Sequence, residues 1–141
     1  MCARVLQCGV RCDMVMSMKP VPRWFVAVCW ALAFLFMLSV GLQVNDPDPI
    51  RWMLIYGLSG IAVGILPGFR FMTAPTIALG LIAAAWAAYL GTQVIGVVGL
   101  SDLWLKMSEK GGAVEVGREA GGLAIIAVGL LGCGAFRATR A

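Results

Sequence analysis

An uninterrupted apolar run near the start of the chain constrains its fold more than any other feature. Trp24–Val44 contains 21 residues without a charged side chain. A helix needs about 20 apolar residues to cross the hydrocarbon core of a bilayer. The run exceeds the roughly 7–15 residues of a signal-peptide core, and Asn45-Asp46-Pro47 follows it in place of a small-residue cleavage site. We therefore expect a retained membrane-spanning helix.

The composition of the whole chain supports a membrane protein. Hydrophobic residues make up 61% and charged residues 13% of the 141 positions, whereas soluble domains carry about 25% charged residues. The mean hydropathy is +0.92. These values exclude a soluble globular enzyme, a disordered chain and a nucleic-acid-binding protein. Histidine is absent, which removes the usual metal ligand and the usual general base near neutral pH.

Three further segments are apolar enough to span a membrane, at about residues 50–66, 74–92 and 116–136. The last contains Arg118 and Glu119, and each charge at the centre of a span would cost about 2.5–3.5 kcal/mol. Both residues must therefore lie near one membrane face. We predict an all-α fold: a single domain over residues 24–136, with four transmembrane helices in a compact bundle.

Two connections are expected on the outer side of this bundle. Asp48 should cap the second span, with Pro49 in its first turn. Ser101 should start a short amphipathic helix over residues 101–110, with Trp104 at the depth of the lipid headgroups.

The distribution of Lys and Arg predicts the orientation. Residues 1–23, the connection at Arg70 and the tail at residues 137–141 hold seven Lys and Arg residues, and the opposite side holds four. Because Lys and Arg favour the cytoplasmic side, both termini should be cytoplasmic, and the plasma membrane is expected in a bacterium. The basic segment 1–23 differs from the rest, and the chain could start at Met14, Met16 or Met18.

Glycine and cysteine favour a structural interpretation of the spans. Gly60-x-x-x-Gly64 and Gly117-x-x-x-Gly121 allow helices to approach closely, and we expect them to pack inside one bundle rather than to form a dimer seam. The chain has an odd number of cysteines. Cys2, Cys8 and Cys12 are expected to be cytoplasmic and reduced. Cys29 and Cys133 lie in spans and are expected to act as small apolar side chains.

Two polar motifs fall on the predicted outer side and define a candidate cluster. Asp48, Trp52 and Tyr56 are spaced four residues apart and form one stripe on the second span. Glu115 and Glu119 share a face of the fourth span, with Arg118 beside it. The candidate site residues are Gln43, Asn45, Asp46, Asp48, Trp52, Tyr56, Glu115, Arg118 and Glu119.

The cluster has several interpretations. Arg118 could bind Asp46 or Asp48 and act as a structural clasp, in a protein that binds a membrane-protein partner or a second copy of itself. Alternatively, the cluster could bind an ion, a small anion or a lipid headgroup in a small transporter or binding protein, since ionisable residues at membrane depth often mark functional sites. For a hard cation the ligands would be Asp46, Asp48 and Glu119. An enzyme is the less favoured interpretation, and we predict no catalytic residue, metal or cofactor.

The same two motifs carry a family resemblance. The chain resembles the transmembrane protein 220 family over roughly residues 24–130, on Gln43-Val44-Asn45-Asp46-Pro47-Asp48-Pro49 with Trp52 and Tyr56, and on Glu115-Val116-Gly117-Arg118-Glu119 with Gly122 and Leu123. The resemblance implies a multi-spanning membrane protein in which the two motifs form one unit. It implies no catalytic role.

Overall fold

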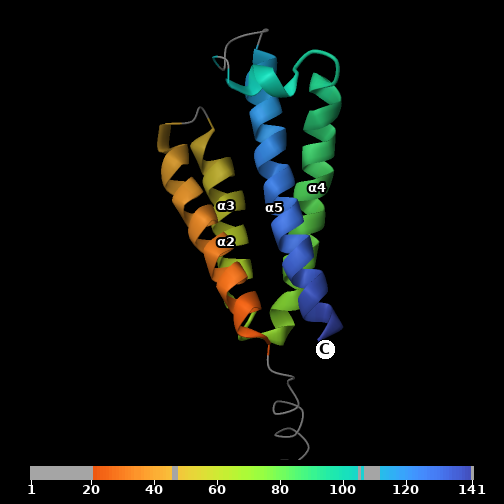
Figure 1. The fold of residues 1–141 in the computed structure, drawn as a ribbon. Coiled ribbons are helices and arrows are strands. Elements are labelled where there is room, and N and C mark those ends of the chain that lie inside the picture. The colour runs from red at the N-terminus through yellow and green to blue at the C-terminus, as the bar shows by residue number, and fades with distance from the viewer. Residues whose placement is uncertain (1–20, 46–47, 105, 107–111, 141) are drawn as a thin grey trace, which may run out of the picture.

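The structure, a computed structural model, describes residues 21–45, 48–104, 106 and 112–140. The regular secondary structure of these residues is helical, with no strand among them (Figure 1). The α-helices are α2 (Arg23–Leu42), α3 (Pro49–Ile65), α4 (Thr73–Val94) and α5 (Ala113–Thr139). Short 3₁₀ helices connect them, namely η1 (Gln43–Asn45), η2 (Arg70–Met72) and η3 (Leu100–Trp104). The predicted all-α class is confirmed.

The lengths of the helices suit a bilayer. The segments Arg23–Leu42, Arg70–Val94 and Ala113–Thr139 are long and apolar enough to cross a membrane. The remaining helix, α3, is apolar but has 17 residues, which corresponds to about 25 Å. A helix somewhat shorter than the roughly 30 Å hydrocarbon core is accommodated by local thinning of the bilayer. The predicted four-helix membrane bundle is therefore confirmed.

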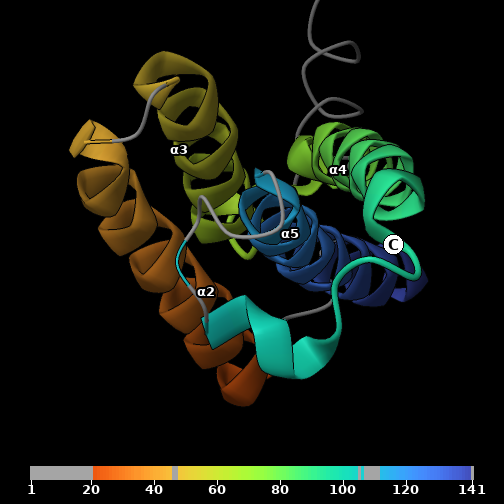
Figure 2. The same ribbon diagram turned by 90° about the horizontal axis from the view of Figure 1, so that it is seen from above.

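The bundle consists of two antiparallel hairpins, α2–α3 and α4–α5. Figures 1 and 2 show α5 between α4 and the first hairpin. The start of α2, η2 and the end of α5 lie together, and we call this the Arg23 end. The start of α3, η3 and the start of α5 lie at the opposite end, which we call the Arg51 end. There the second hairpin extends beyond the first (Figure 1).

Packing within each hairpin depends on close approach at glycine. A Cβ at Gly60 of α3 would lie 3.1 Å from the sulfur of Met37 on α2. A Cβ at Gly134 of α5 would lie 2.6 Å from a side-chain carbon of Ile77 on α4. Gly60 therefore packs inside the bundle, as the sequence predicted. Cys29 and Cys133 are also buried in the core, in agreement with an apolar filler role.

The segment around Ser101 differs from the prediction. Residues 100–104 form the 3₁₀ helix η3 rather than the start of an α-helix, and residues 107–111 lie outside the described part of the chain. The carboxylate of Asp102 accepts a hydrogen bond from the Gly99 N–H at 2.8 Å, and the Asp102 N–H donates to the Gly99 carbonyl at 3.0 Å. These two bonds close a tight turn. The side chain that accepts a backbone N–H there is that of Asp102, whereas the sequence suggested Ser101 as the residue that starts the helix. Trp104 is 91% exposed, so it projects from the Arg51 end.

Candidate functional site

Arg51, in the first turn of α3, is the centre of the polar cluster at the Arg51 end. Its guanidinium lies 3.5 Å from a carboxylate oxygen of Asp48 and 3.6 Å from a carboxylate oxygen of Glu119. Asp48 precedes α3 in the first hairpin, whereas Glu119 belongs to α5 in the second. The side chain of Glu119 is only 20% exposed, compared with 66% for Asp48. One guanidinium therefore joins a solvent-facing and a largely buried carboxylate across the two hairpins.

Two tryptophans support the same guanidinium. The rings of Trp52 on α3 and Trp86 on α4 stack with their centroids 5.4 Å apart and their planes 17° apart. The Arg51 guanidinium carbon lies 5.2 Å from the centroid of the Trp52 ring and 5.4 Å from that of the Trp86 ring. A guanidinium within about 6 Å of an aromatic face gains a cation–π attraction. Arg51, Trp52, Trp86, Asp48 and Glu119 thus form one unit, which we call the Arg51 cluster.

Trp52 is the buried member of the Arg51 cluster. Its side chain is 3% exposed, and its indole Nε1–H is buried without a hydrogen-bond acceptor among the described atoms. A buried donor without a partner costs about 1–3 kcal/mol. Such a donor is a specific site at which an added acceptor would be favourable.

Tyr56 lies one turn deeper on α3 and contacts α5. A Cβ at Gly122 would meet the Tyr56 hydroxyl oxygen at 2.5 Å. The absence of a side chain at Gly122 therefore makes room for the Tyr56 hydroxyl. The predicted stripe of Asp48, Trp52 and Tyr56 turns toward the second hairpin, and Gly60, one turn further on, packs against α2.

The structure brings together some of the predicted site residues and not others. Asp48, Trp52, Tyr56 and Glu119 lie at the contact between the hairpins. Among the described residues, neither Glu115 nor Arg118 forms an ion pair, and Arg118 is exposed. Gln43 is half-buried in η1 and takes no part in the Arg51 ion pairs, while Asp46 and the side chain of Asn45 lie outside the described part of the chain. Asp48 thus pairs with Arg51, where the sequence suggested Arg118, and Glu119 pairs with the same guanidinium.

Asp48 also behaves differently from a simple cap. It occupies the N-cap position of α3 and Pro49 follows in the first turn, as predicted, but its side chain makes no capping hydrogen bond. The carboxylate instead pairs with Arg51. A full positive charge three residues along the helix competes successfully with the backbone N–H groups for this carboxylate.

Trp86 was missed by the sequence analysis. It lies in an alanine-rich helix without a polar neighbour that would mark it. A comparison of depths could have found it, because Trp52 lies near the start of α3 and Trp86 lies in the half of α4 that approaches the same end of the bundle. The described residues contain no group of three or more Cys, Asp or Glu side chains that could hold a metal ion.

Comparison with known families gives one match. Residues 35–135 match the family described as Transmembrane family 220, helix. The chain belongs to transmembrane family 220. The matched range includes both polar motifs and every member of the Arg51 cluster, so the predicted resemblance is confirmed. No curated protein and no solved structure matches the chain.

Membership of transmembrane family 220 agrees with the fold. It supports an integral, multi-pass membrane protein that contacts the lipid bilayer. The family has no established activity, and so the role of the Arg51 cluster has to be argued from its geometry.

Proposed function

We propose that this member of transmembrane family 220 is a non-enzymatic membrane protein with a structural or partner-binding role, in which the Arg51 cluster clasps the two hairpins together. The observation that carries the proposal is the ion pair between Arg51 of the first hairpin and Glu119 of the second, at 3.6 Å. Asp48 and Glu119 more than neutralise the guanidinium, so the cluster has no free positive charge that would attract an anion. The clasp would hold the Arg51 end rigid for a membrane-protein partner or a second copy of the chain.

The membrane environment makes such a clasp useful. Between helices surrounded by lipid, apolar contacts provide little driving force for association, and packing and polar contacts have to supply it. The two hairpins pack well internally, whereas the contact between them depends on a few positions. An ion pair supported by two stacked rings supplies a polar and an aromatic contact at one of these positions.

A double-mutant cycle tests the clasp. We expect Arg51→Gln and Glu119→Gln to destabilise the detergent-purified protein, with a coupling energy of about 0.5–1 kcal/mol, because the pair is partly exposed. Thermal or denaturant unfolding would measure it. Arg118→Gln with Glu119→Gln is the matched control, since Arg118 carries the same charge on the same helix as Glu119 without an ion pair to a described residue. Additive effects of Arg51→Gln and Glu119→Gln would refute the clasp.

A second candidate function is a binding site, or a step in transport, for a small anion, an ion or a lipid headgroup at the same cluster. The buried, unpaired Nε1–H of Trp52 favours it, because a ligand oxygen could accept this hydrogen bond. Thermal unfolding with calcium, magnesium, phosphate or an anionic lipid would detect such a ligand. Binding at 100 times Kd should stabilise the protein by about 2.7 kcal/mol. A shift that is lost in Trp52→Phe but kept in Arg118→Gln would favour the site over the clasp.

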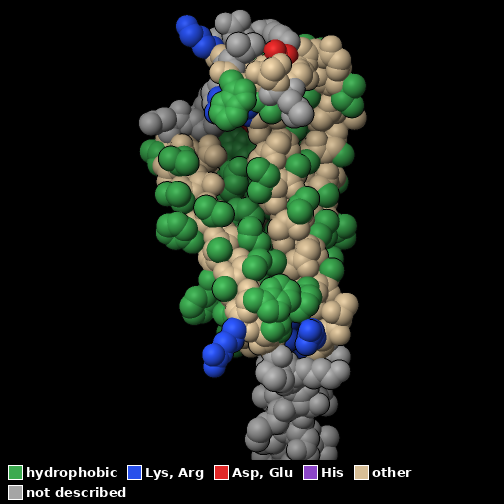
Figure 3. Space-filling model, in the orientation of Figure 1, with side chains coloured by type: hydrophobic (Ala, Val, Ile, Leu, Met, Phe, Trp, Pro, Cys, Tyr) green, Lys and Arg blue, Asp and Glu red, His purple; other side chains and the backbone are tan. Residues whose placement is uncertain are grey.

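The orientation in the membrane is also a proposal. All described carboxylates lie on segments at the Arg51 end, whereas Arg23, Arg70, Arg137 and Arg140 belong to segments at the Arg23 end. Figure 3 shows acidic side chains near the Arg51 end and basic ones at the Arg23 end. Because Lys and Arg favour the cytoplasmic side, we place the Arg23 end, and with it both termini, in the cytoplasm. In a bacterium the membrane would be the plasma membrane.

A further inference from the structure

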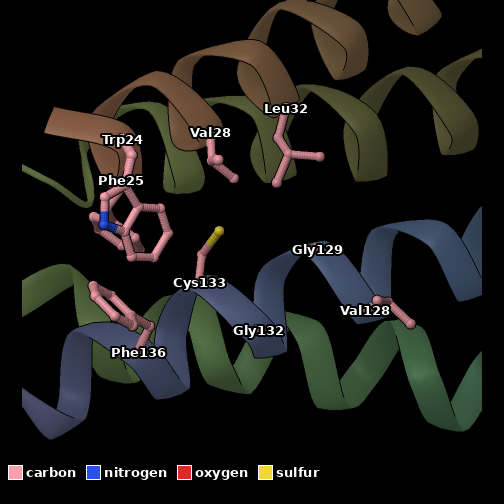
Figure 4. A pocket seen from close by; sticks show the side chains of 9 residues that line it. All are labelled: Trp24, Phe25, Val28, Leu32, Val128, Gly129, Gly132, Cys133 and Phe136. Carbon is pink, nitrogen blue, oxygen red and sulfur yellow. The ribbon is translucent and has the colours of Figure 1, made fainter. Parts of the chain in front are cut away.

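A groove separates α2 from α5 in the half of the bundle near the Arg23 end. It encloses about 320 Å³ and is lined only by apolar side chains, glycines and one cysteine (Figure 4). Leu32 and Cys133 line its interior, and Gly129 and Gly132 form its surface on α5. Val128 is 74% and Val28 44% exposed at its rim. The groove therefore opens on the outer surface of the bundle, at a depth where lipid chains surround the protein.

Aromatic rings close the groove toward the Arg23 end. The Phe136 ring of α5 lies with its centroid 4.9 Å from that of Trp24 and 4.6 Å from that of Phe25, both on α2 (Figure 4). Trp24 is 57% exposed. Tryptophan at such a position typically lies at the level of the lipid headgroups. The groove thus runs from this level into the hydrocarbon region.

Positive charges surround the aromatic end of the groove. The Arg140 guanidinium lies 5.1 Å from the centroid of the Phe136 ring, and Arg23 directly precedes Trp24 and is exposed. No described segment at this end contains a carboxylate. Figure 3 shows basic side chains on both sides of the apolar surface at this end. Arg140 therefore lies against Phe136 and Arg23 adjoins Trp24 in sequence, and the described residues at this end include no acidic side chain.

We propose that the α2–α5 groove binds an anionic glycerophospholipid from the surrounding leaflet, with one acyl chain in the groove and the headgroup phosphate between Arg23 and Arg140. The apolar lining matches the chain, and the positive charge beside the aromatic end matches the phosphate. This site lies at the opposite end of the bundle from the Arg51 cluster. It does not depend on the proposed clasp.

The headgroup part of the proposal can be tested on the full chain in neutral detergent. We expect phosphatidylglycerol to raise the Tm at lower concentration than phosphatidylcholine with the same acyl chains, and native mass spectrometry to detect the bound lipid. Each arginine near an anionic lipid should contribute about fivefold in affinity. The double variant Arg23→Gln/Arg140→Gln should bring phosphatidylglycerol down to the affinity of phosphatidylcholine. The control, Arg118→Gln at the other end, should keep the preference. Equal affinity for both lipids in the wild-type protein would overturn the proposal.

The groove itself can be tested with two glycine variants on the same helix. A Cβ meets nothing within 4 Å at either Gly132, which lines the groove, or Gly121, which does not. We expect Gly132→Leu to fill the groove and weaken phosphatidylglycerol binding at least tenfold, while Gly121→Leu retains wild-type binding. Unchanged binding in Gly132→Leu would refute the groove as the site. If cross-linking and light scattering instead show a dimer that Gly132→Leu dissociates, with no effect of lipid, the occupant is a second copy and the proposal is wrong.

Discussion

Trp52 of α3 and Trp86 of α4 stack with their planes 17° apart. The two helices belong to different hairpins, so the stack is a direct contact between the halves of the bundle. The Arg51 guanidinium lies near both rings, and Glu119 approaches it from α5. Three of the four helices thus meet in one small region at the Arg51 end. The stability of the bundle should depend on this region, and the first prediction addresses it.

Trp52→Ala should destabilise the protein by about 3 kcal/mol, because it removes a buried ring and leaves a cavity below Arg51. Trp52→Phe keeps a ring that can stack on Trp86 and also removes the unpaired Nε1–H, so it should cost less than about 1.5 kcal/mol. Chemical unfolding in detergent would compare the two variants. Equal losses for Ala and Phe would show that the stack contributes nothing.

Gly122→Ala should destabilise the protein by about 1–3 kcal/mol, since the new methyl group would meet the Tyr56 hydroxyl oxygen at 2.5 Å. Tyr56→Phe removes that oxygen and should restore most of the stability in the double variant. Gly121→Ala is the control on the same helix, where a Cβ meets nothing within 4 Å. It should be neutral or stabilising by up to about 1 kcal/mol. If Tyr56→Phe fails to rescue Gly122→Ala, the contact between α3 and α5 is not the cause of the loss.

Two arginines near the end of α5 should respond differently to the same substitution. Arg137 is 2% exposed, whereas Arg140 is exposed. We expect Arg137→Gln to destabilise the lipid-free protein by about 2 kcal/mol, because it removes a long side chain that packs along its whole length. Arg140→Gln should change the stability by less than about 0.5 kcal/mol. Thermal unfolding that ranks the variants in the opposite order would contradict this burial.

The orientation predicts the labelling of single cysteines in a background without native cysteine. Lys106→Cys at the Arg51 end should react with a membrane-impermeant maleimide in intact cells. Arg70→Cys at the Arg23 end should react only after permeabilisation. Both native residues are exposed, so access should depend on the side of the membrane alone. The reverse pattern would place both termini outside.

Much of the fold could be predicted from the sequence because the constraint of the bilayer is strong. Backbone groups in lipid must be satisfied within the segment, so each long apolar run had to form a helix, and the observed helices α2 to α5 begin and end within three residues of the predicted spans. The 3₁₀ turn at η3 could not be predicted in this way. It depends on the hydrogen bonds between Asp102 and Gly99, and side-chain periodicity carries no information about them.

The candidate site was predicted only in part for a related reason. Sequence motifs predicted that Asp48 and Trp52 on the second span and Glu119 on the fourth lie on the same outer side of the membrane. Which cation pairs with them depends on the rotation of α5 about its axis, and a sequence does not encode this rotation locally. Glu119 turns toward α3 and Arg118, the next residue, turns away, as adjacent residues on a helix must. Arg51 therefore takes the role that the charge pattern suggested for Arg118.

The position of Arg51 in the first hairpin and Glu119 in the last helix has a consequence for biogenesis. The ribosome completes α2 and α3 well before it synthesises α5, so Arg51 reaches the membrane while its partner in the second hairpin does not yet exist. During this interval Asp48, in the same hairpin and 3.5 Å from Arg51 in the finished protein, is the counter-ion at hand. Asp48 can therefore neutralise Arg51 in the nascent hairpin, and Glu119 adds a second carboxylate beside the same guanidinium when the last helix inserts.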